Sequence, residues 1–154
     1  MSKRILIIFV VLFSIILSGC NDAQYINFKK KPNKFYYTEE LYKIVSSKDF
    51  TLSAFDTNVY REENPKGKDK DIVINFIKCL SKDNFIDKPS NLPEKPVYKL
   101  FISSSETKFV INIYENNIVS IFPWDGMFSE DFINTENIPQ AYKLYLFCKY
   151  VFKQ

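Results

Sequence analysis

Histidine is absent from all 154 residues of the chain. Its absence excludes the commonest general base, the usual serine and cysteine catalytic triads, and metal sites that contain histidine. Glycine is nearly absent as well: Gly19, Gly67 and Gly126 are the only three, too scattered to build a phosphate-binding loop. We therefore expect no cofactor, no metal site and no nucleotide chemistry of the familiar kinds, and the sequence favours a non-catalytic role.

A large excess of either charge is also missing. The chain carries 21 basic and 18 acidic side chains, and removal of a first segment that contains Lys3 and Arg4 leaves 19 basic against 18 acidic ones. Proteins that bind nucleic acids neutralise phosphates with a strongly basic face. We therefore expect no nucleic-acid partner.

One long hydrophobic run is present, and it lies at the start of the chain. Residues 5–17 are apolar except for Ser14, and they follow Lys3 and Arg4. With 13 residues, this run is shorter than the roughly 20 that a membrane-spanning helix needs. A charged start followed by a short apolar run is typical of a secretion signal.

The signal ends in Leu17-Ser18-Gly19-Cys20, which resembles the bacterial lipobox. In that motif an apolar residue and two small residues precede the cysteine that receives diacylglycerol. The resemblance implies that residues 1–19 are a signal peptide and that Cys20 becomes the lipid-bearing first residue. Two acyl chains would then hold the protein on the outer face of the cell membrane. The alternative is an ordinary secretion signal, or an uncleaved signal anchor, with a chance cysteine.

Residues 20–34 are expected to form a lipidated tether that contains Lys29, Lys30, Lys31 and Lys34. Each lysine close to an anionic bilayer can contribute about 1 kcal/mol to membrane binding. The lipid bilayer is thus a predicted partner through Cys20, aided by these lysines. The alternative is a solvated linker.

Residues 35–154 are predicted to fold as one α+β domain. Apolar residues recur with the helical period over 38–47, 69–81 and 139–152, and the pattern predicts strands over 50–55, 97–103, 109–114 and 118–122. Short links join the last three strands, so we expect a three-stranded antiparallel meander. Residues 61–69 and 87–96 are expected to be loops. The predicted architecture is an antiparallel sheet packed with about three helices.

Cys79 and Cys148 remain once Cys20 is lipidated. An even pair in an exported protein permits one disulfide. Each cysteine also lies on the apolar stripe of its predicted helix, where a free thiol behaves as a small hydrophobe. We expect two buried, reduced thiols.

The segment from Phe122 to Asp131 has the most unusual composition. It contains Trp124, Asp125 and Phe128, which are our candidates for contact with a sugar, a peptide or a partner. Alternatively, Trp124 and Phe128 fold back on the core while Asp125 and Gly126 form a turn. We expect this second arrangement, with Trp124 mostly buried. A hard cation held by Asp125, Glu130 and Asp131 is a weaker alternative, because no calcium-loop pattern is present.

The chain also resembles a family of small uncharacterised lipoproteins of low-GC Gram-positive bacteria. The resemblance lies in Lys88-Pro89, in Leu92-Pro93-Glu94-Lys95-Pro96-Val97-Tyr98, in Phe122-Pro123-Trp124-Asp125-Gly126 and in Leu146-Phe147-Cys148-Lys149-Tyr150-Val151-Phe152. It implies no activity.

The sequence therefore favours a non-catalytic, membrane-tethered module that binds an envelope protein, a peptide or a glycan. One alternative is a glycan hydrolase that uses two carboxylates such as Asp125 and Glu130, a chemistry that needs no histidine. Another is a purely structural envelope protein.

Overall fold

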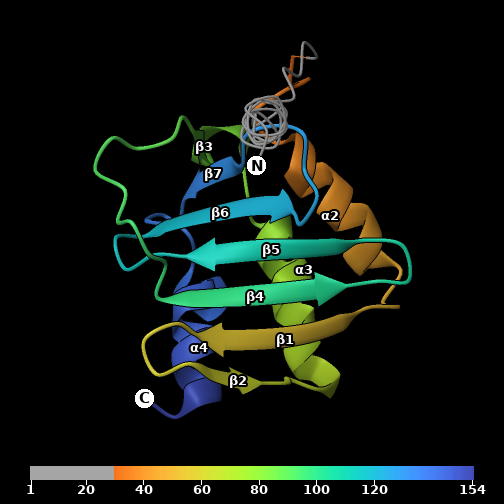
Figure 1. The fold of residues 1–154 in the computed structure, drawn as a ribbon, viewed down its shortest axis with the longest axis vertical. Helices are drawn as coiled ribbons and strands as arrows, with labels where there is room; N and C mark the ends of the chain where they lie inside the picture. Colours follow the sequence, from red (N-terminus) through yellow and green to blue (C-terminus); the bar gives the residue numbers. More distant parts are fainter. Residues whose placement is uncertain (1–29) are drawn as a thin grey trace, which may run out of the picture.

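The computed structural model describes residues 30–154, so the predicted signal peptide, Cys20 and Lys29 lie outside the described residues. One antiparallel sheet carries all the helices on a single face (Figure 1). The strands are β1 (Thr51–Asp56), β2 (Arg61–Glu63), β3 (Phe85–Ile86), β4 (Tyr98–Ser103), β5 (Lys108–Ile113), β6 (Ile118–Pro123) and β7 (Asp131–Asn134). The helices are α2 (Tyr36–Ser46), α3 (Asp71–Lys78) and α4 (Leu144–Phe152).

The sheet has seven strands in the order β2-β1-β4-β5-β6-β7-β3. Strands β4, β5 and β6 form the predicted meander, since Leu100 pairs with Ile111 and Ile111 pairs with Ile121. The α+β class, the three helices and the single domain are confirmed for residues 30–154. None of the helices in this range has the length and hydrophobicity that a membrane crossing requires.

Three short strands were not expected from the sequence. Strand β2 lies within the predicted loop 61–69 and consists of three exposed charged residues, which carry no alternation of apolar and polar side chains. Such charges suit the edge of a sheet, where they discourage pairing with another chain. Strands β3 and β7 pair with each other at the opposite end of the sheet, and β3 has only two residues. Helix α4 begins at Leu144 instead of near Pro139, because a short turn over Gln140–Tyr142 precedes it.

The hydrophobic core lies between the sheet and the helices. Alternate residues of the strands point toward the helices and are almost fully buried: Leu52, Ala54, Leu100, Ile102, Ile111, Ile113, Ile121 and Ile133. The helices contribute Leu41, Val45, Val73, Phe76, Leu144 and Cys148. The other set of alternate strand residues forms the opposite side of the sheet, which we call the open face because none of the described helices covers it (Figure 1).

A buried carboxylate ties the start of the described chain to helix α2 and strand β7. Asp131 is fully buried, and its Oδ2 accepts hydrogen bonds from the backbone N–H of Thr38 at 2.7 Å and from the Thr38 hydroxyl at 2.8 Å. Its Oδ1 lies 2.6 Å from the ammonium nitrogen of Lys31. Asp131 therefore caps the first turn of α2 from a distant strand, a position where negative charge is favourable.

The end of the chain closes the other side of the core. The Tyr98 ring stacks on Phe152 with centroids 5.7 Å apart, and its hydroxyl donates a hydrogen bond to Gln154 Oε1 at 2.6 Å. Burial raises the pKa of Tyr98 to about 12. The phenol therefore stays neutral throughout the physiological range.

Both remaining cysteines are free thiols. Cys148 lies on α4 and is buried in the hydrophobic core, and burial raises the pKa of its thiol. Cys79 is half-buried at the end of α3, and its sulfur lies 3.0 Å from the carbonyl oxygen of Phe76. The expectation of reduced thiols is confirmed, although Cys79 is less deeply buried than expected.

Candidate functional site

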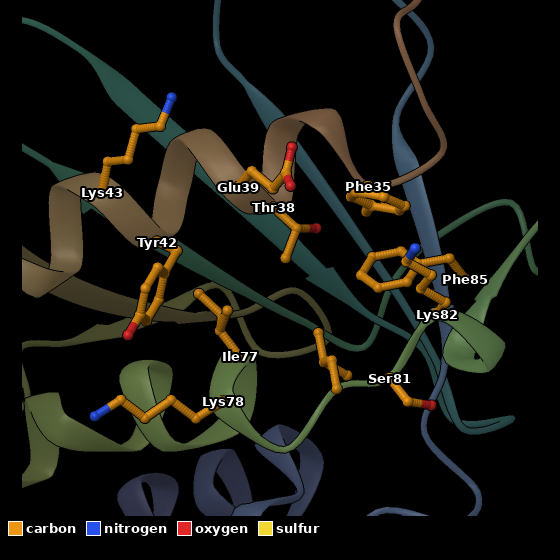
Figure 2. A pocket seen from close by; sticks show the side chains of 11 residues that line it. Phe35, Thr38, Glu39, Tyr42, Lys43, Ile77, Lys78, Ser81, Lys82 and Phe85 are labelled. Carbon is orange, nitrogen blue, oxygen red and sulfur yellow. The ribbon is translucent and has the colours of Figure 1, made fainter.

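A groove of about 750 Å³ runs between helices α2 and α3. Its apolar lining comes from Phe35, Tyr42, Ile77, Leu80 and Phe85. In Figure 2 the rings of Phe35 and Phe85 lie against each other at one end, with centroids 5.5 Å apart, and Tyr42 and Ile77 face one another farther along. Its volume is in the range typical of sites for small ligands, and most of its lining is apolar.

The rim of this groove is predominantly basic. Lys43, Lys78 and Lys82 border it together with Glu39. The ammonium nitrogen of Lys43 lies 2.7 Å from Glu40, and the hydrogen bond between them raises the Lys43 pKa. Within residues 30–154, Lys78 and Lys82 form no ion pair. These two side chains lie toward opposite ends of the groove, with Lys82 beside Phe85 (Figure 2).

The signal in the sequence for this groove is the apolar pattern over 69–81, which is wider than one packing interface requires. Part of the stripe faces the sheet and part does not: Val73 and Phe76 are fully buried, whereas Ile77 and Leu80 are half-buried. A stripe wider than one packing interface leaves apolar surface for a second contact.

Trp124 was expected to be mostly buried, and this expectation is wrong. Its exposed fraction is 67%. Strand β6 ends at Pro123, and the turn that follows, closed by a hydrogen bond of 3.0 Å from the Gly126 N–H to the Pro123 carbonyl, leaves the indole on the surface. The alternation along β6 places Trp124 on the open face, next to Lys108 of the adjacent strand.

The Lys108 ammonium lies between two aromatic rings on the open face. Its nitrogen is 5.1 Å from the centroid of Trp124 and 4.7 Å from that of Phe101. Both distances are in the range of cation–π interactions, which stabilise exposed pairs by about 0.5 to 1 kcal/mol. The contact with Lys108 favours this orientation of the indole, and most of the indole surface remains accessible.

Phe128 and Gly126 have a structural role. Phe128 packs edge-on against Tyr36 at 5.6 Å, and its backbone N–H donates a hydrogen bond of 2.7 Å to the Tyr37 hydroxyl. A Cβ atom on Gly126 would lie only 2.9 Å from the same hydroxyl, so a larger residue here would displace the Tyr37 side chain. The expected arrangement of the loop is thus correct for Phe128 and for the turn at Gly126, and wrong for Trp124.

The side chains of Asp125, Glu130 and Asp131 do not form a cluster. Asp125 is exposed, Glu130 is half-buried and borders a different groove, and Asp131 is fully buried beneath Lys31. No cluster of three or more potential metal ligands occurs in residues 30–154. The three acids therefore form neither a cation cage nor a pair of carboxylates that face a shared cleft.

The lysines of the predicted tether differ in their surroundings. Lys31 is largely buried, and its ammonium also donates hydrogen bonds to the carbonyls of Ser129 and Glu130. Lys34 pairs with the exposed Asp87 at 2.9 Å, and Lys30 is exposed. Among the described residues, Lys30 and Lys34 are therefore the ones that stay predicted to contact the bilayer. Lys31 instead forms an ion pair inside the folded domain.

Residues 31–148 match a family model described as a domain of unknown function, DUF4883. The chain belongs to this family. It is also similar to a crystal structure of a protein from Clostridium perfringens that is provisionally named a lipoprotein, with 35% sequence identity and a TM-score of 0.74. The similarity covers 81% of this chain and 100% of that one. No curated protein matches the sequence. These matches confirm the expectation that the chain belongs to an uncharacterised, lipoprotein-like family.

Proposed function

We propose that this protein is a lipid-anchored, extracytoplasmic and non-catalytic binding module, and that the groove between α2 and α3 holds a small anionic amphiphile. The anchor rests on the lipobox at Leu17 to Cys20, and the similarity to a protein named a lipoprotein supports it. The absence of histidine from the chain supports a binding role.

The observation that carries the choice of ligand is the combination of an apolar lining with two unpaired lysines. Apolar surface that stays exposed in a groove favours an alkyl chain, at roughly 25 cal/mol per Å² of area removed from water. Lys78 and Lys82 border the same groove and have no acidic partner among the described residues. A carboxylate or phosphate headgroup would supply one.

Calorimetric titration with dodecanoate and with uncharged dodecanol tests this proposal on residues 21–154. We expect both compounds to bind in the groove and dodecanoate to bind more tightly. The double variant Lys78→Gln/Lys82→Gln should weaken dodecanoate about tenfold, or about 1.4 kcal/mol, and leave dodecanol unchanged.

The matched control is Lys66→Gln/Lys68→Gln, which removes two exposed charges outside the groove. It should bind dodecanoate as the parent does. An equal loss in both double variants would mean that net charge alone governs binding, and the proposed site would be wrong. Failure of dodecanoate to bind the parent would also overturn it.

A further inference from the structure

We propose that the open face of the sheet is a second binding site, for a glycan strand that carries carboxylates. The site is a diagonal band that we call the aromatic band. Its members are Trp124, Lys108, Phe101, Lys99, Phe55 and Tyr60. This site lies on the side of the sheet opposite the helices, so it is separate from the groove between α2 and α3.

The band is continuous across four strands. Lys108 connects Trp124 to Phe101 through its two ring contacts. Lys99 lies two residues before Phe101 on the same side of β4 and pairs in register with Phe55 of β1. The Phe55 ring in turn meets Tyr60 edge-on, with centroids 6.2 Å apart.

Rings are exposed at both ends of the band. The exposed fractions are 67% for Trp124 and 76% for Tyr60. Strand spacing of ~4.8 Å and a rise of ~3.3 Å per residue place Trp124 and Phe55 about 20 Å apart. The band is therefore long enough for a chain of several sugar rings.

The chemistry of the band matches a pyranose chain. Aromatic faces carry negative partial charge and attract the C–H groups on the flat side of a sugar ring. Trp124 and Tyr60 are exposed enough to stack on such a ring, and Lys108 lies beside the indole, where it can bind a charged substituent of the sugar. A polyol phosphate chain has no rings that could stack on the aromatic band, so a glycan is favoured as the ligand.

Charge on the open face favours carboxylates on that glycan. Lys99 and Lys108 lie within the band, and the Lys95 ammonium lies 5.0 Å from the Tyr60 centroid. Glu62 is the acid that pairs in register with Phe55, and it accepts a hydrogen bond from the Ser53 hydroxyl. Within the band three ammonium groups face the Glu62 carboxylate, and the exposed Asp125 follows Trp124 at one end, so the band remains net positive and attracts an anionic chain.

A buried polar network lies beside Lys99 in the sheet. Asn112 pairs in register with Lys99 on the open face, is only 6% exposed, and donates through Nδ2 to the Ser120 hydroxyl at 3.3 Å. The Tyr114 side chain forms hydrogen bonds with both Asn112 and Ser120. Asn112 therefore belongs to a buried polar network, and the accessible part of the band consists of its rings and lysines.

Trp124 is the single tryptophan of the chain, so its fluorescence reports binding at the band directly. The full chain in neutral detergent micelles is titrated with a tetrasaccharide of alternating N-acetylglucosamine and N-acetylmuramic acid. Chitotetraose is the uncharged match, and a glycerol phosphate oligomer is the ringless anion. We expect saturable quenching by the first, at least tenfold weaker binding of the second, and no response to the third.

Two pairs of variants locate the site, with binding measured by calorimetry and folding by melting temperature. Tyr60→Ala should weaken binding at least fivefold, whereas Tyr150→Ala, which removes an equally exposed ring from α4, should not. Lys99→Gln should weaken the carboxylate glycan about tenfold and leave chitotetraose unchanged, whereas Lys66→Gln should have no effect.

The proposal is overturned if the muramyl tetrasaccharide leaves Trp124 fluorescence unchanged, or if the glycerol phosphate oligomer binds as well. It is also overturned if folded Tyr60→Ala and Lys99→Gln bind like the parent. None of these results depends on dodecanoate binding, so failure of this site and failure of the groove are distinguishable.

Discussion

Replacement of Asp131 with alanine is expected to lower the free energy of unfolding by about 3 to 5 kcal/mol, the usual cost of removing one partner from a buried ion pair. The carboxylate is fully buried and neutralises Lys31 at 2.6 Å. Its removal leaves the Lys31 ammonium in a largely buried position and leaves the Thr38 N–H, in the first turn of α2, without its acceptor. Urea denaturation of residues 21–154 measures this loss.

Asp87→Ala provides a matched control, because Asp87 pairs with Lys34 from the same lysine-rich segment. That pair is also close, at 2.9 Å, but its side chains are 56% and 87% exposed. Exposed pairs contribute at most about 1 kcal/mol. Comparable destabilisation by the two substitutions would contradict the structural role assigned to Asp131.

Replacement of Cys20 with serine is expected to abolish lipidation completely, because the hydroxyl of serine cannot form the thioether that carries diacylglycerol. Mass spectrometry of the N-terminal peptide is the decisive readout. The parent should show a modified Cys20 at its N-terminus with the added mass of its acyl chains, and Cys20→Ser should show none. Membrane fractionation alone would not suffice, since an uncleaved apolar segment could retain the variant.

Cys79→Ser serves as the control, because Cys79 is a free thiol within the folded domain. It should keep the acylated N-terminus. If Cys20→Ser retained an unchanged acyl mass, the lipoprotein assignment would be wrong.

The sequence predicted the central part of the fold well. Strands β4, β5 and β6 have strong apolar patterns and short links, and the three helices have clear apolar stripes. Both are local signals, which a single sequence carries directly. Strands β2, β3 and β7 were missed because they are two to four residues long and owe their pairing to neighbours distant in the sequence.

The candidate sites were harder to predict because they depend on which surfaces the tertiary structure leaves uncovered. Trp124 lies in register with the open-face residues of β6, but the sequence does not show that helices cover only the other face. The groove arises from the packing of α2 beside α3, which no local pattern specifies. Lys31 belongs to a run typical of a linker, and its burial depends on Asp131, 100 residues later.

The central claim is that the groove between α2 and α3 is the amphiphile site, and nuclear magnetic resonance with a spin-labelled acid tests it most directly. Dodecanoate that bears a nitroxide on its alkyl chain is added to methyl-labelled protein. We predict strong broadening of the methyl signals of Ile77 and Leu80, which line the groove. The signal of Leu146, which is 41% exposed on α4, should remain sharp. Equal broadening of all three residues, or sharp signals from Ile77 and Leu80 at saturating ligand, would contradict the account.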